Sequence, residues 1–243
     1  MKKFILVALA AAALFSACTA PAKKLVVAQD TTFPPMEFIN DAKEQVGFDV
    51  DLVKAVAKEA KLDVEFKSVN WDGIFAGLAN DTYDIVASSV TITDERKANM
   101  DFSTPYVNAG QVLVVLIDNN KDTKLSDFVG RNVGAQVNTT GSMEVDKIKE
   151  IKLKAYDDIA LSFDDLVNAR VEAVVIDAPV AGQYIKNAKF AGKIKVVGEP
   201  MTNEFYGLVV KKGNKELLDK INAALATLES NGTLEALKTQ WLK

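Results

Sequence analysis

The stretch YDIVASSVTITDER at residues 83–96 decides the fold expected for this chain. Its first five residues are mostly apolar and predict a buried strand. Ser88, Ser89 and Thr91 follow where that strand ends, and Arg96 comes shortly after them. An arginine side chain is a planar fork that pairs with a carboxylate through two hydrogen bonds, and hydroxyl groups supply further donors. The stretch therefore predicts a site for a small carboxylate at the end of a strand.

On both sides of this stretch, strand-like runs alternate with segments of helical periodicity. At residues 48–60, for example, apolar residues recur every four positions, which is typical of an amphipathic helix. This alternation predicts an α/β protein with helices on the faces of its sheets. The predicted strands are 24–28, 64–69, 83–87, 111–117, 132–135, 152–156, 173–176, 194–197 and 206–211. The predicted helices are one starting at Trp71 after an Asn70 cap, one holding Arg96 after a Thr93 cap, one starting near Thr140, and 48–60, 125–129, 159–168, 178–187, 216–228 and 234–242.

The segments form two halves with two crossings between them, near residues 108–113 and 200–206. We therefore expect two lobes, the second inserted into the first. Residues 24–110 and 204–243 would form the first lobe and residues 111–203 the second. Ligands of open α/β sheets bind at the carboxyl ends of strands, and the candidate residues below lie at such ends.

Composition excludes several classes of function. The chain has no histidine, so Ser-His-Asp catalysis, Cys-His catalysis and His-ligated zinc are excluded. Residues 19–243 carry 27 basic and 33 acidic side chains, a net charge of −6 with no basic cluster, which argues against nucleic-acid binding. We expect no cofactor and no metal.

Residues 1–18 are predicted to be a targeting segment. Lys2 and Lys3 precede an apolar run that is too short to span a bilayer, and Ser-Ala-Cys at 16–18 resembles a bacterial lipobox. Cys18 is the single cysteine of the chain, so no disulfide can form within it. We expect lipidation at Cys18 followed by a tether at 19–23. The alternative is an ordinary signal peptide with an incidental thiol.

Two segments of the first half carry further candidate binding residues. Asp30 follows the first strand, where an acid can hold a cationic or amide group, and Phe33 offers a ring face. Trp71 can pair with Phe33 as an aromatic clamp. The structural alternatives are a turn with a packed aromatic residue and a core tryptophan.

Two segments of the second half follow predicted strands in the same way. The loop at 136–142 contains Gln136, Thr139 and Thr140 and leads into a helix, whose free N–H groups attract anions. Asp177 ends a buried strand, where its carboxylate can hold an α-ammonium group. Helix capping is the structural alternative for the threonines and for Asp177.

Together these segments resemble the periplasmic polar amino-acid-binding proteins of ABC importers, solute-binding protein family 3. The resemblance covers about residues 25–242. The segments that carry it are DTTFPPMEF at 30–38, VGFDVDL at 46–52, SVTITDER at 89–96, FSTPY at 102–106 and TTG at 139–141. Asn138 stands where the family usually has glycine, and asparagine tolerates unusual backbone dihedrals better than most residues.

The resemblance implies a type II periplasmic-binding-protein fold, in which two α/β lobes are joined by two hinge strands and close on the ligand. It also implies a role for each matching position. The α-carboxylate would be held by Arg96, Thr91 and Thr139, and the α-ammonium group by Asp177 and by Ser89 through its backbone carbonyl. The side-chain pocket would be formed by Asp30, Phe33, Trp71, Ser88, Gln136 and Thr140.

The expected function is capture of a free polar amino acid by a monomer and its delivery to an ABC permease, with the lipid at Cys18 holding the protein at the membrane. Because an acidic ligand would bring a second carboxylate to Asp30, we expect a basic ligand (arginine, lysine or histidine) or glutamine. One alternative is a cyclohexadienyl dehydratase-like enzyme with Glu37 or Asp30 as its acid. Another is a sensor ectodomain.

Overall fold

The structure is a computed structural model that describes residues 24–243. The predicted signal segment, Cys18 and the tether at 19–23 lie outside the described residues. Among residues 24–243, no helix is long and apolar enough to cross a membrane.

Within residues 24–243, the first lobe is built on a five-stranded sheet in the order β5-β1-β6-β15-β7. Strands β5, β1 and β6 run parallel, and β15 runs antiparallel to β6 and β7. The bounds are β1 Leu25–Gln29, β5 Val64–Ser68, β6 Ile85–Val86, β7 Met100–Phe102 and β15 Val209–Lys211. A small antiparallel sheet lies beside it, made of β2 Thr32–Phe33, β3 Glu37–Ile39 and β4 Gln45–Val46.

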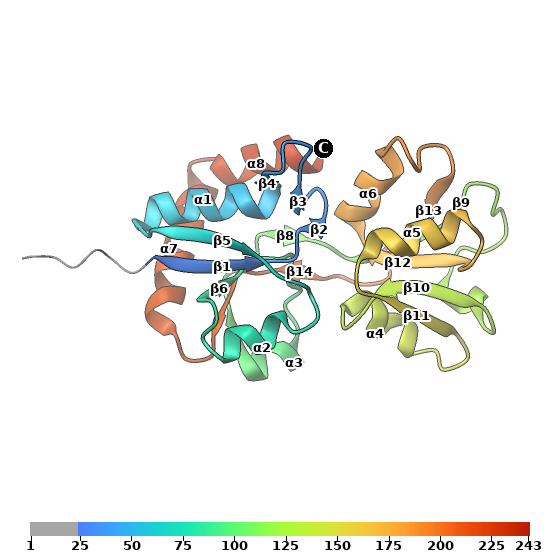
Figure 1. Cartoon of the computed structure of the whole chain (residues 1–243), viewed down its shortest axis with the longest axis horizontal. Helices are drawn as coiled ribbons and strands as arrows, with labels where there is room; N and C mark the ends of the chain where they lie inside the picture. The colour runs from blue at the N-terminus through green and yellow to red at the C-terminus, as the bar shows by residue number, and fades with distance from the viewer. Residues whose placement is uncertain (1–23) are drawn as a thin grey trace, which may run out of the picture.

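Helices cover both faces of this sheet (Figure 1). The helix α1, Phe48–Ala60, buries Phe48, Leu52 and Val56 on one stripe and packs against α7. Apolar residues at this spacing stabilise a helix by removing one of its faces from water. The remaining helices of this lobe are α2 Ile74–Ala79, α3 Asp94–Asn99, α7 Lys215–Ser230 and α8 Thr233–Leu242.

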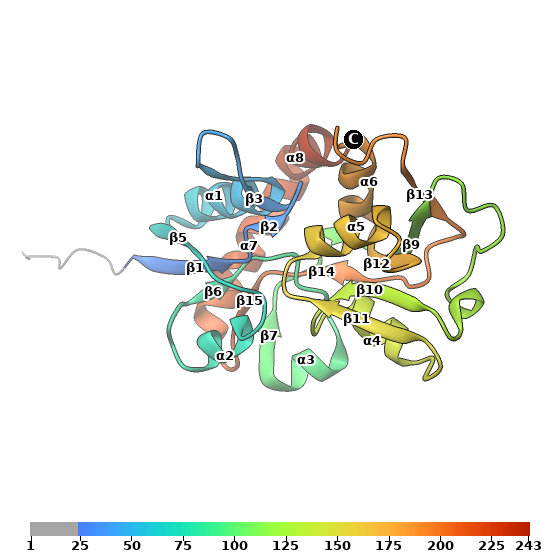
Figure 2. The same ribbon diagram turned by 45° about the vertical axis from the view of Figure 1, so that its right-hand side comes forward.

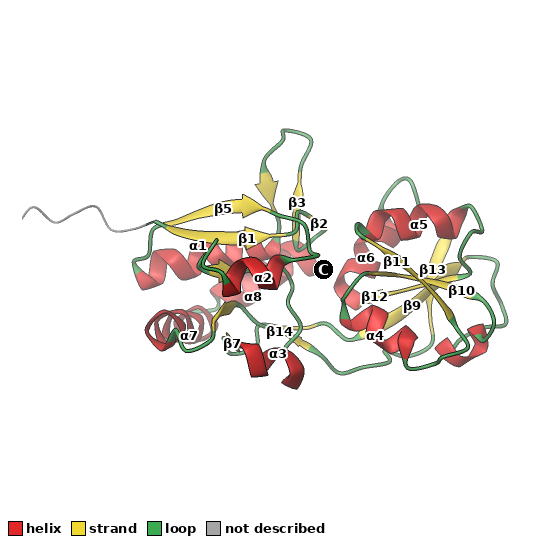
Figure 3. Ribbon diagram, turned by 60° about the horizontal axis from the view of Figure 1, so that its bottom comes forward, coloured by secondary structure: helices red, strands yellow, loops and turns green. Residues whose placement is uncertain are grey.

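The second lobe repeats the same plan with the strand order β11-β10-β12-β9-β13. Strands β11, β10 and β12 run parallel, and β9 runs antiparallel to β12. Helices again lie on both sides of the strands (Figure 3). The bounds are β9 Gln111–Leu116, η1 Leu125–Phe128, β10 Asn132–Gln136, α4 Thr140–Asp146, β11 Lys152–Tyr156, α5 Ile159–Val167, β12 Ala173–Asp177, α6 Ala178–Lys186 and β13 Ile194–Val197.

Two antiparallel hinge strands join the lobes (Figure 1), and one of them, β14, is also labelled in Figure 2. The strand β8, Val107–Asn108, pairs with β14, Phe205–Tyr206. The Asn108 Nδ2 group also donates a hydrogen bond to Asn203 Oδ1 at 2.7 Å. Both segments coincide with the crossings expected from the sequence, and a short two-stranded connection of this kind is suited to hinge motion.

Three predicted elements differ from the structure. The helix expected from Trp71 begins at Ile74 instead, and its N-cap is Gly73 rather than Asn70. Gly73 has φ 90°, in the left-handed region, so a right-handed helix cannot run through it. The strand expected at 206–211 is divided between β14 and β15, and the helix expected at 125–129 is the 3₁₀ helix η1.

Candidate functional site

A cavity lies between the lobes at the carboxyl ends of β1, β6, β10 and β12, and about 310 Å³ there is not filled by protein atoms, a volume that includes space open to solvent. All eleven candidate binding residues predicted from the sequence line it, together with Glu37. The structure therefore brings the predicted residues together in one cavity. Its lining is Asp30, Phe33, Glu37, Trp71, Ser88, Ser89, Thr91, Arg96, Gln136, Thr139, Thr140 and Asp177.

Arg96 is a buried cation in this cavity. It is 7% exposed and lies on α3, whose N-cap Thr93 accepts a hydrogen bond from the Arg96 backbone N–H, as predicted. The guanidinium donates to the backbone carbonyls of Thr91 at 3.0 Å and Asn138 at 3.3 Å. Burial lowers the pKa of Arg96, while nearby acids oppose that shift. Both hydrogen-bond acceptors are neutral, so the guanidinium retains the capacity to pair with an anion.

Aromatic rings support this guanidinium. The Arg96 Cζ atom lies 5.5 Å from the centre of the Trp71 ring and 5.2 Å from the centre of the Phe75 ring. Trp71 and Phe75 contact each other edge to face, with centroids 5.2 Å apart. Cation–π contacts at these distances fix the plane of the fork. Trp71 and Phe33 both line the cavity, as the predicted clamp requires, and Trp71 additionally orients Arg96.

Asp177 is a buried acid that also faces the cavity. It ends β12 and precedes α6, yet among the described residues its side chain forms no capping hydrogen bond. Its Oδ1 atom accepts a hydrogen bond from Gln111 Nε2 at 3.0 Å. Burial raises the pKa of Asp177 to about 7. The structural alternative, helix capping, therefore does not account for this carboxylate.

The cavity contains a second acid, Asp30. Its carboxylate accepts hydrogen bonds from Gln136 Nε2 at 2.8 Å and from Thr32 Oγ1 at 2.9 Å. Burial raises the pKa of Asp30, and these hydrogen bonds oppose the shift. The Asp30 backbone N–H donates to Ser88 Oγ at 2.8 Å. The Asp30 carboxylate is thus hydrogen-bonded to two other side chains, whereas the Arg96 guanidinium is hydrogen-bonded to two backbone carbonyls.

Two loops of the cavity have left-handed residues. Asn138 has φ 55° and Ser89 has φ 50°, a region that most residues other than glycine avoid. Asparagine therefore serves in the position where the family usually has glycine. Thr139 caps α4 by accepting from the Ser142 backbone N–H at 3.2 Å, so the capping role expected as an alternative is present.

Direct contacts across the cavity hold the lobes together. Gln136 of the second lobe bonds Asp30 of the first, and Arg96 bonds the Asn138 carbonyl. Asn138 Nδ2 also donates to Asp72 Oδ1 at 3.1 Å. The lobes are therefore in a closed arrangement, with the cavity walled from both sides.

Two buried acids at the cavity, Glu37 and Asp49, were not predicted from the sequence to support the binding site. Glu37 accepts hydrogen bonds from Ser88 Oγ at 3.0 Å and Ser89 Oγ at 3.2 Å, and Asp49 accepts from the Ser89 backbone N–H at 2.7 Å. Burial raises the pKa of Glu37 well above its usual value and that of Asp49 to about 6. Each acid stands between large apolar residues in the sequence, MEF and FDV, which was the available signal. These acids hold the two serines in place.

Gln111 and Glu204, at the hinge, were also not identified. The Gln111 side chain contacts both Asp177 and Thr140, at 3.0 Å and 3.1 Å, and Thr140 Oγ1 donates to Glu204 Oε2 at 2.7 Å. Neither residue belongs to a motif near the other site residues in the sequence, so only the fold reveals their position.

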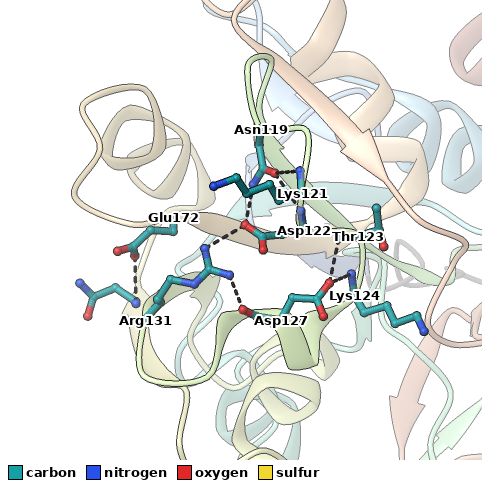
Figure 4. Close-up of polar contacts among 9 residues, drawn as sticks. Asn119, Lys121, Asp122, Thr123, Lys124, Asp127, Arg131 and Glu172 are labelled. Atoms are coloured by element: carbon teal, nitrogen blue, oxygen red, sulfur yellow. Dashed lines mark hydrogen bonds and ion pairs between the residues drawn. The ribbon is translucent and has the colours of Figure 1, made fainter.

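Another charged cluster, around Arg131 in the second lobe, is internally neutralised (Figure 4). Arg131 pairs with Asp122 at 2.9 Å and donates to the Asp127 carbonyl, and Asp127 accepts from the backbone N–H groups of Thr123 and Lys124. The Arg131 guanidinium holds the pKa of Asp122 below its usual value. This cluster stabilises a loop. In the described part of the chain, no group of three or more acidic, cysteine or histidine side chains is placed to hold a metal ion.

The two-lobed fold and the enclosed polar cavity define a ligand-binding protein that closes around a small molecule. The family model for bacterial extracellular solute-binding proteins, family 3, matches residues 25–243. The chain belongs to this family. The predicted α/β fold class, two lobes of the type II periplasmic-binding-protein fold joined by two hinge strands, is thereby confirmed.

Relatives with assigned ligands cover nearly the whole chain. A probable histidine-binding protein of Neisseria gonorrhoeae is 35% identical, over 99% of this chain and 96% of that protein. ABC transporter arginine-binding protein 1 of Escherichia coli K12 is 34% identical, over 99% of both. A solved ancestral arginine-binding protein bound to arginine is 40% identical with a TM-score of 0.87, over 90% of this chain and 98% of that one. An ancestral arginine-binding protein has also been solved bound to glutamine.

Proposed function

We propose that this protein captures a free polar L-amino acid between its lobes and delivers it to an ABC permease. One observation carries the proposal. Arg96 is a buried cation and Asp177 is a buried acid that lines the same cavity, and their hydrogen bonds to the protein are to neutral groups. Burying an uncompensated charge is costly, so such a pair favours a ligand that carries both opposite charges. An α-amino acid is such a ligand.

The roles of the residues follow from their chemistry. Arg96 would pair with the α-carboxylate, assisted by the hydroxyls of Thr91 and Thr139. Asp177 and the Ser89 backbone carbonyl would accept hydrogen bonds from the α-ammonium group. The side-chain pocket would then consist of Asp30, Phe33, Trp71, Ser88, Gln136 and Thr140, which line the rest of the cavity.

The ligand would be arginine, lysine or histidine, or else glutamine. Asp30 favours a cationic or amide group, and an acidic side chain there would place two carboxylates together in a buried site. Gln136, which bonds Asp30, offers both a donor and an acceptor for a polar side chain. Relatives named for arginine and histidine, and an ancestral relative bound to glutamine, support this choice.

The transport cycle would use the hinge. The open protein would bind its ligand on one lobe, and closure would bury the ligand before docking to the permease. The lobes would comprise 24–110 with 204–243, and 111–203. A lipid on Cys18 would hold the protein at the membrane, since multiple acyl chains give stable anchoring. Mass spectrometry of the N-terminal peptide from the membrane fraction tests lipidation, and a Cys18→Ser variant should appear in the soluble fraction.

The proposal is tested by a thermal-shift screen against the twenty amino acids, with Arg96→Ala alongside. A ligand that binds only the folded state raises the melting temperature. A shift with basic amino acids or glutamine, absent in the variant, supports the proposal. No shift with any amino acid overturns it, and the largest shift with aspartate or glutamate overturns the ligand choice.

The cleft enzyme is a second candidate, because Glu37 lines the cavity and burial raises its pKa, as a general acid requires. Glu37 is, however, engaged by the hydroxyls of Ser88 and Ser89, which favours a supporting role. Mass spectrometry of prephenate or arogenate after incubation with the protein separates the two functions. Conversion of either compound would identify an enzyme.

A further inference from the structure

Glu204 links the hinge to the proposed amino-acid site. It directly precedes β14, and its backbone carbonyl accepts a hydrogen bond from the Ala109 N–H on the other hinge segment at 2.8 Å. Gln111 starts β9, just beyond that segment, and its backbone N–H donates to Thr202 Oγ1 at 2.8 Å. Both side chains therefore originate at the point where the lobes are joined.

The carboxylate of Glu204 is the centre of a hydrogen-bond network. Its Oε2 atom accepts from Thr140 Oγ1 at 2.7 Å and lies 3.3 Å from Gln111 Nε2. The same Gln111 nitrogen lies 3.0 Å from Asp177 Oδ1. Thr140 Oγ1 also lies 3.4 Å from Thr91 Oγ1 in the opposite lobe. Glu204 thus reaches Thr91, on the proposed carboxylate side of the cavity, through Thr140, and it reaches Asp177, on the proposed ammonium side, through Gln111.

The charge of Glu204 also acts on the site. The charged and titratable groups that face Asp177 are Arg96 from α3, Tyr206 from β14 and Glu204 from the hinge. Glu204 raises the pKa of Asp177, after the larger effect of burial, and raises that of Arg96. Asp177 and Glu204 place two carboxylates beside the Gln111 amide group. Together they favour the binding of a cation in the neighbouring part of the cavity.

We propose that Glu204 is a positioning residue for amino-acid binding, whose carboxylate orients Thr140 and, through Gln111, Asp177 in the closed form. The inference rests on the proposed function. Glu204 is a hinge residue that does not line the cavity, and it would nevertheless contribute to the affinity for the α-ammonium and α-carboxylate groups. Because the contact between Thr140 and Thr91 joins the two lobes, the network is complete only when the lobes are closed.

The test compares three variants by calorimetric titration with L-arginine, L-lysine, L-histidine and L-glutamine at several pH values. Glu204→Gln removes the charge and keeps the shape. Glu204→Asp keeps the charge and withdraws it from Thr140. Asn203→Ala is the matched control, because Asn203 makes its hydrogen bond to Asn108 at the same hinge without contacting the site.

Glu204→Gln is expected to weaken binding roughly fivefold to tenfold at a pH above 7, since a hydrogen bond to a charged group is replaced by a neutral one. It should also move the acid limb of the affinity profile to lower pH, because Asp177 loses a neighbour that raises its pKa. Glu204→Asp should weaken binding and leave that limb in place. Asn203→Ala should bind within roughly twofold of the unmodified protein.

Two results separate the inference from the proposed function. If the unmodified protein binds none of L-arginine, L-lysine, L-histidine and L-glutamine, the proposed ligand assignment fails. If it binds and Glu204→Gln retains both its affinity and its pH profile, the positioning role is overturned. Equal losses in Glu204→Gln and Asn203→Ala would also overturn it, because the effect would then belong to the hinge as a whole. Circular dichroism and melting curves establish whether each variant is folded. If Glu204→Gln does not fold, the affinity of Glu204→Asp decides the test instead.

Discussion

The two ends of the cavity are built differently. At the end formed by Arg96 and Asp177, each charge is buried and its hydrogen bonds within the protein are to backbone carbonyls or one amide. At the end formed by Asp30, the carboxylate is already partnered by Gln136 and Thr32. The first end therefore suits one fixed chemistry, a zwitterion, whereas the second has contacts that different side chains can share or replace. A single scaffold can thus keep its hold on the amino-acid group while changing its ligand.

The largest expected effect comes from Arg96→Ala, which removes the cation of the zwitterion end. Affinity for every amino acid ligand should fall about 100- to 1,000-fold, because an α-carboxylate would be left buried without its partner. Arg96→Lys should rescue little, since lysine cannot present a bidentate fork. Calorimetric titration measures both variants. Retained binding by Arg96→Ala would contradict the comparison between the two ends.

Asp177→Asn should separate function from stability at the same end. Affinity should fall about 30- to 100-fold through the loss of the anion. Native Asp177 keeps its proton up to about pH 7, against 3.8 for the ordinary group, so the native state binds more protons than the unfolded state in this range and stability falls as pH rises. Asp177→Asn should therefore be more stable than the unmodified protein above pH 7, by up to roughly 4 kcal/mol.

Thermal melts without ligand at about pH 8 and about pH 4 test this sign. The stabilisation should be present at the higher pH and small at the lower, where native Asp177 is protonated and the pH lies close to the ordinary pKa of 3.8. A variant that is less stable at the higher pH would show that Asp177 is a structural residue, as a helix cap would be.

Asp30→Asn tests the side-chain end. Affinity for arginine and lysine should fall about 10- to 100-fold because the acid that faces a cationic side chain is lost. Affinity for glutamine should change much less, since asparagine still offers a hydrogen-bond acceptor. Competition between arginine and glutamine, followed by titration, gives the ratio directly. A parallel loss for both ligands would mean that Asp30 acts on closure rather than on ligand choice.

Trp71→Leu should have the smallest effect of this series. The substitution removes the ring under the Arg96 guanidinium and leaves Phe75 on it. Affinity should fall about threefold to tenfold for all ligands, in line with a cation–π contact. A loss confined to basic ligands would instead place Trp71 against the ligand side chain, as the predicted clamp with Phe33 implies.

The sequence predicted the cavity lining because its residues occur in short segments after strands. Asp30, Ser88, Gln136 and Asp177 each follow or end a strand, and the sheet brings strand ends to one edge. Gln111 and Glu204 were not predicted because they belong to the hinge. Their side chains reach the site only because two segments that are distant in the sequence pair with each other. The start of α2 was wrong because the left-handed Gly73 outweighs the capping tendency of Asn70.

The central claim is recognition of both charged groups of an amino acid. The most direct measurement is calorimetric titration with arginine, lysine, histidine and glutamine, each beside the amine that lacks its α-carboxylate. At least one amino acid should bind tightly, and its decarboxylated counterpart should bind about 100-fold more weakly or not at all, because Arg96 would then be buried without an anion. Equal affinity for an amino acid and its amine would contradict the account.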